Sequence, residues 1–122
     1  MTPSQLVPVA FVLGLAACGP SYPIGTVAIQ GETTGTYYPK PEVAYTPENL
    51  AIVAKNASAI PGCNVQTGDG STVSAWCGGS TYIAAKNGLN PKVISVACLG
   101  KLDGPGLEAC ITMGTKLVAG AK

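Results

Sequence analysis

Five cysteines have the most distinctive chemistry in this chain, because histidine and arginine are absent from its 122 residues. Without histidine there is no imidazole to act as a base or metal ligand, and without arginine there is no bidentate clamp for phosphate. The sequence also contains no Gly-x-Ser-x-Gly elbow and no Ser-x-x-Lys pair. Only an unusual Ser–Lys contact remains for nucleophilic catalysis. We therefore expect a protein that is not an enzyme.

Four of the cysteines form an even set: Cys63, Cys77, Cys98 and Cys110. Zinc and iron–sulfur sites usually take their ligands in close pairs such as Cys-x-x-Cys, and no such pair occurs here. The sequence therefore predicts two structural disulfides, no metal site and no cofactor. Cys63 and Cys77 lie at equal distances from Gly70, so an in-register hairpin places them opposite each other. Cys98 is then left to pair with Cys110.

The carboxylates have structural explanations in the sequence. Asp69 lies between two glycines in a turn, and Asp103 and Glu108 lie where a helix is predicted to begin. We therefore favour turn and capping roles over a catalytic carboxylate pair.

The N-terminal residues have the pattern of an export signal. Leu6–Ala17 is a run of apolar and small residues, too short to span a bilayer but as long as the apolar region of a signal peptide. Leu15-Ala16-Ala17-Cys18 resembles the lipobox of bacterial lipoproteins, in which a branched apolar residue precedes small residues and a cysteine. In one departure, Met1–Gln5 lacks the Lys or Arg that signal peptides normally carry. The alternatives are a buried core segment and a plain secretory peptide or membrane anchor.

The resemblance implies that residues 1–17 are a lipoprotein signal peptide and that Cys18 is lipidated. It implies a diacylglycerol thioether on the Cys18 sulfur and an acyl chain on the amino group that cleavage exposes. Two or three chains bind a membrane firmly, because each buried CH₂ contributes about 0.8 kcal/mol. The expected location is the periplasmic side of the bacterial cell envelope. Gly19 resembles the residue found in lipoproteins sent to the outer membrane, which we favour over the inner membrane.

Residues 18–46 are predicted to form a lipid-anchored tether rich in proline, tyrosine and glycine. Within it, Thr26–Gln30 and Thr36–Tyr38 flank a loop and are compatible with a short hairpin. Aromatic side chains in such a segment gain little unless they dock on something. The candidates for binding a protein partner are Tyr37, Tyr38 and Tyr45. Packing on their own domain and contact with the membrane surface are the alternatives.

Residues 47–122 are predicted to form a small α+β domain stapled by the two disulfides. The predicted elements are a helix from Pro47 with Thr46 as its N-cap, a hairpin of Cys63–Thr67 and Ser71–Cys77, a short helix over 80–88, a strand over Lys92–Leu99 and a last helix after Asp103. This order predicts an antiparallel hairpin plus one further strand, with two or three helices on one face.

The low fraction of charged residues and the small net charge limit the classes of function that we expect. Only 11% of the residues are charged, against about 25% in soluble domains, and a net charge of +1 gives no field to attract nucleic acid. We expect a structural or accessory subunit that docks on a larger membrane or periplasmic assembly. The alternative is a stand-alone extracytoplasmic module that binds a small ligand or envelope component. For that module Trp76 is the candidate ligand-binding residue, although a core residue covering the neighbouring disulfide is the plainer interpretation.

Overall fold

The computed structural model describes residues 25–122, so the predicted signal peptide, Cys18 and the start of the predicted tether lie outside the described residues. The elements of the described part are β1 (Thr26–Ile29), β2 (Thr34–Tyr38), α2 (Pro47–Ser58), β3 (Asn64–Thr67), β4 (Val73–Cys77), β5 (Ser80–Lys86), β6 (Ile94–Leu99) and α3 (Gly104–Leu117).

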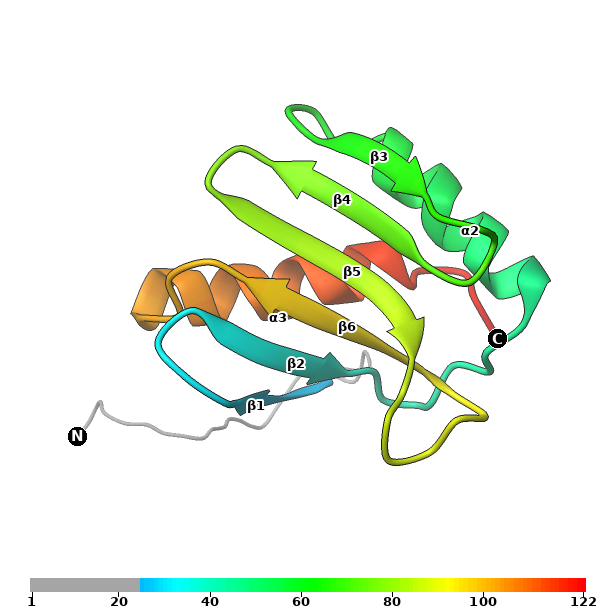
Figure 1. Ribbon diagram of the computed structural model, residues 1–122, viewed down its shortest axis with the longest axis horizontal. Coiled ribbons are helices and arrows are strands. Elements are labelled where there is room, and N and C mark those ends of the chain that lie inside the picture. The colour runs from blue at the N-terminus through cyan, green and yellow to red at the C-terminus, as the bar shows by residue number, and fades with distance from the viewer. Residues whose placement is uncertain (1–24) are drawn as a thin grey trace.

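The strands form one six-stranded sheet in the order β1-β2-β6-β5-β4-β3, and every neighbouring pair is antiparallel. Helix α2 packs on β3 and β4, while α3 packs on β1, β2 and β5. Figure 1 shows both helices behind the sheet, on the same face. The predicted α+β class with helices on one face is confirmed. The sheet is larger than predicted, because the expected hairpin and single strand account for only half of it.

The short helix predicted over residues 80–88 is wrong, because Ser80–Lys86 is β5. Alanine and lysine near the end of this segment favour a helix by intrinsic propensity. In the fold, residues 80–84 of the segment pair with β4 on one side and residues 81–86 pair with β6 on the other. Tertiary pairing in the middle of the sheet therefore overrides local propensity.

The predicted tether is also wrong for the residues that the structure describes. Strands β1 and β2 form the hairpin that the sequence allowed, and β2 then pairs with β6. Tyr37 on β2 is only 1% exposed and belongs to the core. The domain therefore includes residues 25–46, because the edge of β6 would otherwise be left without a hydrogen-bonding neighbour.

The predicted helix starts are confirmed in detail. The Thr46 hydroxyl accepts a hydrogen bond from the Asn49 backbone N–H at 3.1 Å, and the Asp103 carboxylate accepts one from Gly106 N–H at 3.0 Å. Each helix also has proline in its first turn, where a backbone N–H is not needed.

Both predicted disulfides are confirmed. Asn64 lies opposite Trp76 in the register of β3 and β4, which sets Cys63 beside Cys77. The Cys98–Cys110 disulfide joins β6 to α3 inside the core. Structural disulfides persist in oxidising compartments, so these two bonds indicate an extracytoplasmic location.

None of the helices within residues 25–122 is long and apolar enough to cross a membrane.

Candidate binding surface

Neither helix packs on the second face of the sheet, which we call the open face. Side chains alternate between the two faces along each strand, and the paired registers show which positions share a face. Buried residues such as Val96 and Ala84 mark the helix side. The open face is made of the residues between them: Thr26, Ala28, Thr34, Thr36, Tyr38, Asn64, Gln66, Ser74, Trp76, Thr81, Ile83, Ala85, Ser95, Ala97 and Leu99. Figure 1 views the sheet from this side.

The open face contains no charged side chain. All seven lysines and all six carboxylates of the chain lie in loops, in helices or on the helix side of the sheet. Lys86 ends β5 on the helix side, where its ammonium lies 5.9 Å from the centre of the Tyr45 ring. A surface that spans six strands without a charge is unusual for a domain that faces water on all sides.

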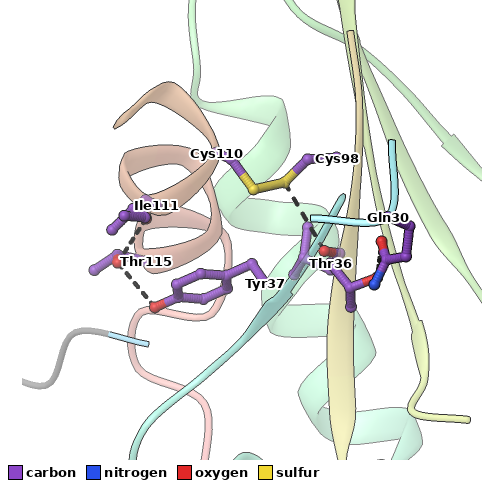
Figure 2. The surroundings of a disulfide bond; sticks show 8 residues. Gln30, Thr36, Tyr37, Cys98, Cys110, Ile111 and Thr115 are labelled. Atoms are coloured by element: carbon purple, nitrogen blue, oxygen red, sulfur yellow. Dashed lines mark hydrogen bonds between the residues drawn. A yellow bond between two sulfur atoms is a disulfide. The ribbon is translucent and has the colours of Figure 1, made fainter. Parts of the chain in front are cut away.

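Most polar side chains of the open face have no hydrogen-bonding partner among residues 25–122. Figure 2 shows Thr36 and Tyr37 pointing to opposite sides of β2, and the Thr36 hydroxyl donates a hydrogen bond to Gln30 Oε1 at 3.5 Å. Among the described residues, no other hydroxyl, amide or indole N–H of the open face hydrogen-bonds to the protein. Ser95 is only 8% exposed, but the other polar side chains of the face are partly or fully exposed and can contact water or a ligand.

Trp76 lies on the open face and is 51% exposed. The core position that was the plainer interpretation of this residue is therefore wrong. Successive strand residues point to opposite faces, so Trp76 points away from the side on which Cys77 is bonded. In the sheet register Trp76 lies between Asn64 on β3 and Thr81 on β5. Its ring is thus flanked by an amide and a hydroxyl on neighbouring strands.

The three tyrosines proposed to bind a partner have different environments. Tyr37 is buried under α3, which removes it from any surface. Tyr45 packs on its own domain, because its hydroxyl donates to the Ser71 carbonyl at 2.9 Å and Lys86 covers its ring. Tyr38 is half-buried and lies on the open face. Only Tyr38 therefore shares a surface with Trp76.

The structure also contains an open cavity of about 300 Å³ at the other end of the strands from Trp76. Its lining residues come from the end of β2, from the loop between β5 and β6 and from the start of β6: Tyr38, Pro39, Glu42, Asn87, Leu89, Asn90, Val93 and Ile94. The side-chain oxygen of Asn87 already accepts a hydrogen bond from the Leu89 N–H at 2.7 Å. Trp76, the candidate ligand-binding residue, does not line this cavity.

Both aspartates have structural partners. The pKa of Asp69 is lowered below its ordinary value, because its carboxylate accepts hydrogen bonds from the Ser71 hydroxyl and backbone N–H. Asp103 caps α3 and lies 3.7 Å from the Lys101 ammonium. Within residues 25–122, His, Cys, Asp and Glu form no group of three or more that could hold a metal ion.

Sequence reasoning missed Asn64, Gln66 and Thr81 as candidate site residues. The alternation of Asn64 and Gln66 with Val65 was visible and predicted a strand with one polar side. What the pattern could not show is that no helix packs on that side.

The fold and the open face define the structural class of the protein. It is a small, disulfide-linked α+β domain with helices on one side of its sheet. No family model, curated protein or solved structure matches this chain.

Proposed function

We propose that this protein is a lipid-anchored protein of the bacterial cell envelope whose domain acts by binding, and that the open face is its binding surface. The observation that carries the proposal is the six-stranded sheet whose second face has no charged residue and, within residues 25–122, leaves most of its polar side chains without a hydrogen-bonding partner. A stand-alone module that binds an envelope component fits this polar, self-contained surface best. Binding is favoured over catalysis because Asp69 and Asp103 are engaged in a turn and a helix cap.

The proposed location rests on two kinds of support. The disulfides indicate an oxidising compartment, and the resemblance of Leu15–Cys18 to a lipobox supports lipid attachment on the periplasmic side of the envelope. Gly19 favours the outer membrane over the inner membrane. A lipid anchor would hold the domain close to the envelope, where an open binding surface can engage a fixed component.

Replacing Cys18 by Ala is expected to abolish lipid attachment. Without the sulfur no diacylglycerol thioether can form, so the chain should no longer incorporate labelled palmitate. Labelling of cells followed by gel autoradiography measures this, and a Cys18→Ser variant controls for the size of the side chain. Palmitate incorporation into the Cys18→Ala protein would refute the anchor assignment.

A lysine on the open face is expected to prevent binding to the envelope. Thr81 is half-buried beside Trp76 on a central strand of the sheet, so Thr81→Lys places an ammonium where a ligand would have to remove its water. The purified chain is mixed with detergent-washed cell envelopes and sedimented. The wild type should pellet, Thr81→Lys should stay largely in the supernatant, and Thr36→Lys should do the same.

The matched control is Thr112→Lys, the same exchange at an exposed position of α3 away from the open face. It should pellet like the wild type, and circular dichroism and thermal melting should show all variants folded. If the wild type does not pellet, or if Thr81→Lys pellets as well as Thr112→Lys, the open face is not the binding surface.

An accessory subunit docked on a protein assembly is the second candidate function. The apolar side chains Ile83, Leu99 and Trp76 favour it, because together they could contact a protein partner. Treating the washed envelopes with a protease before mixing distinguishes the two candidates. Loss of sedimentation after proteolysis favours the accessory subunit, and retention favours the module that binds a non-protein envelope component.

A further inference from the structure

We propose that the ligand of the open face is an uncharged glycan chain, with Trp76 stacking on one sugar ring and Asn64, Gln66 and Thr81 hydrogen-bonding to the hydroxyls around it. This inference rests on the proposed function, because it names the occupant of the same surface. The chain sequence, the strand register and the exposure of these side chains carry it.

Charge excludes the commonest polymeric ligands. Nucleic acids, anionic lipid surfaces and acidic glycans bind through Lys and Arg, because a polyanion gains affinity by releasing its counterions. None of the seven lysines occupies a strand position on the open face, and the chain has no arginine. Cationic peptides would need carboxylates to bind, and no strand position of the open face carries a carboxylate. A surface without charged side chains therefore matches an uncharged ligand.

The polar side chains of the open face select a ligand with many hydroxyls. An apolar partner would strip water from the threonine, serine, asparagine and glutamine side chains without replacing its hydrogen bonds. A sugar offers hydroxyls that both donate and accept, which matches amides and hydroxyls equally well. Four threonines lie on the face, together with the amides on β3: Thr26, Thr34, Thr36, Thr81, Asn64 and Gln66.

The surroundings of Trp76 fit one sugar ring. A pyranose has a face of C–H groups, which packs on an aromatic ring, and a rim of hydroxyls, which needs hydrogen-bonding groups beside that ring. Asn64 and Thr81 lie directly opposite Trp76 on the two neighbouring strands. Ser74 lies two residues before it on the same face, and Gln66 is paired with Ser74. The exposed half of the indole is therefore surrounded by suitable partners.

A second copy of this chain is the strongest rival occupant. Five strand spacings and about five residues per strand give a face of about 24 Å by about 17 Å, or about 400 Å². That is about half of the roughly 800 Å² that each partner buries in a standard protein interface. A glycan chain needs only a line of contacts across the face, so the same area is sufficient for it.

The chain contains one tryptophan, so its fluorescence reports directly on the proposed contact. The purified full-length protein is titrated with tetramers of β-1,4-linked N-acetylglucosamine and of β-1,4-linked glucose, and with an oligogalacturonate of equal length as the charged counterpart. We expect a saturable change in Trp76 emission with at least one neutral tetramer, unaffected by added salt, and none with the oligogalacturonate.

Calorimetric titration then compares variants. Trp76→Ala should weaken binding about ten-fold or more, while Trp76→Phe should retain part of it. The matched control is Ile29→Ala, which truncates a side chain of similar exposure (52%) at a strand position on the helix side of the sheet. Ile29→Ala should bind like the wild type.

Several results would overturn the inference. The inference is wrong if neither neutral tetramer changes the Trp76 emission. It is also wrong if Trp76→Ala and Ile29→Ala lose the same amount of binding affinity. A concentration-dependent dimer in analytical ultracentrifugation, abolished by Thr81→Lys, would show that a second copy covers the face. If washed envelopes bind through the open face but the tetramers do not, the glycan inference fails while the proposed function stands. If the envelopes do not bind, the proposed function itself fails.

Discussion

Gly114→Ala should destabilise the protein, although alanine is the better helix former by about 1 kcal/mol. Gly114 lies inside α3, directly over the Tyr37 ring, and a Cβ at this position would overlap the ring atoms. The ring cannot move away, because its hydroxyl accepts the Gly25 N–H at 3.0 Å and lies 3.0 Å from Thr115 Oγ1. We expect the overlap to lower the free energy of unfolding by about 1–3 kcal/mol, measured in urea.

The hydrogen-bond directions in this cluster follow from one another. Thr115 Oγ1 donates to the Ile111 carbonyl at 2.8 Å, so its hydrogen is not available to Tyr37. The Tyr37 hydroxyl therefore donates to Thr115 Oγ1 and accepts from Gly25 N–H. Figure 2 shows Tyr37, Thr115 and Ile111 linked by these hydrogen bonds near the Cys98–Cys110 disulfide. The cluster joins β2, α3 and the residue before β1, which explains why the predicted tether is part of the domain.

A double-mutant cycle tests the contact with Tyr37. Tyr37→Ala alone should cost about 3–5 kcal/mol, since it leaves a large cavity in the core. In the Tyr37→Ala background the exchange Gly114→Ala should become neutral or stabilising, because the ring is gone and the helix propensity of alanine remains. The contact would be contradicted if Gly114→Ala stabilised the wild type, or if the effects of the two exchanges simply added.

Local chemistry explains which parts of the fold could be predicted from the sequence. The glycine–aspartate turn at 68–70 and the symmetric cysteines determine the register of β3 and β4, and that prediction is confirmed. The caps at Thr46 and Asp103 act within a few residues, so they too were visible. These features depend on residues that are close together in the chain, and a single sequence shows those residues directly.

Long-range pairing explains the errors. Strand β2 pairs with β6, about sixty residues further along the chain. No pattern in the residues near either strand predicts that pairing. In β5 both Tyr82 and Ile83 are apolar although they point to opposite faces, so the alternation typical of a strand was hidden. For the same reason Trp76 could be placed on a strand but not on a face. The candidate site depends on which face the helices leave uncovered, and that is decided by the whole fold.

The two disulfides should contribute unequally to stability. Their sequence separations are similar, 14 and 12 residues, so the loop entropy removed from the unfolded chain is nearly the same, about 3 kcal/mol each. Their surroundings differ, because Cys98 and Cys110 are at most 1% exposed whereas Cys63 and Cys77 are partly exposed. Removing the buried sulfurs also leaves a void between β6 and α3.

Replacing both Cys98 and Cys110 by Ala should therefore cost about 4–5 kcal/mol, and the same change at Cys63 and Cys77 about 2–3 kcal/mol. Urea unfolding of the two double variants measures the difference. Under mild reduction of the native protein, mass spectrometry of alkylated cysteines should show Cys63 and Cys77 labelled first, because a reductant reaches Cys98 only when α3 separates from the sheet. Equal stability losses, or earlier labelling of Cys98 and Cys110, would mean that α3 is held much more loosely than its packing on Tyr37 and β6 implies.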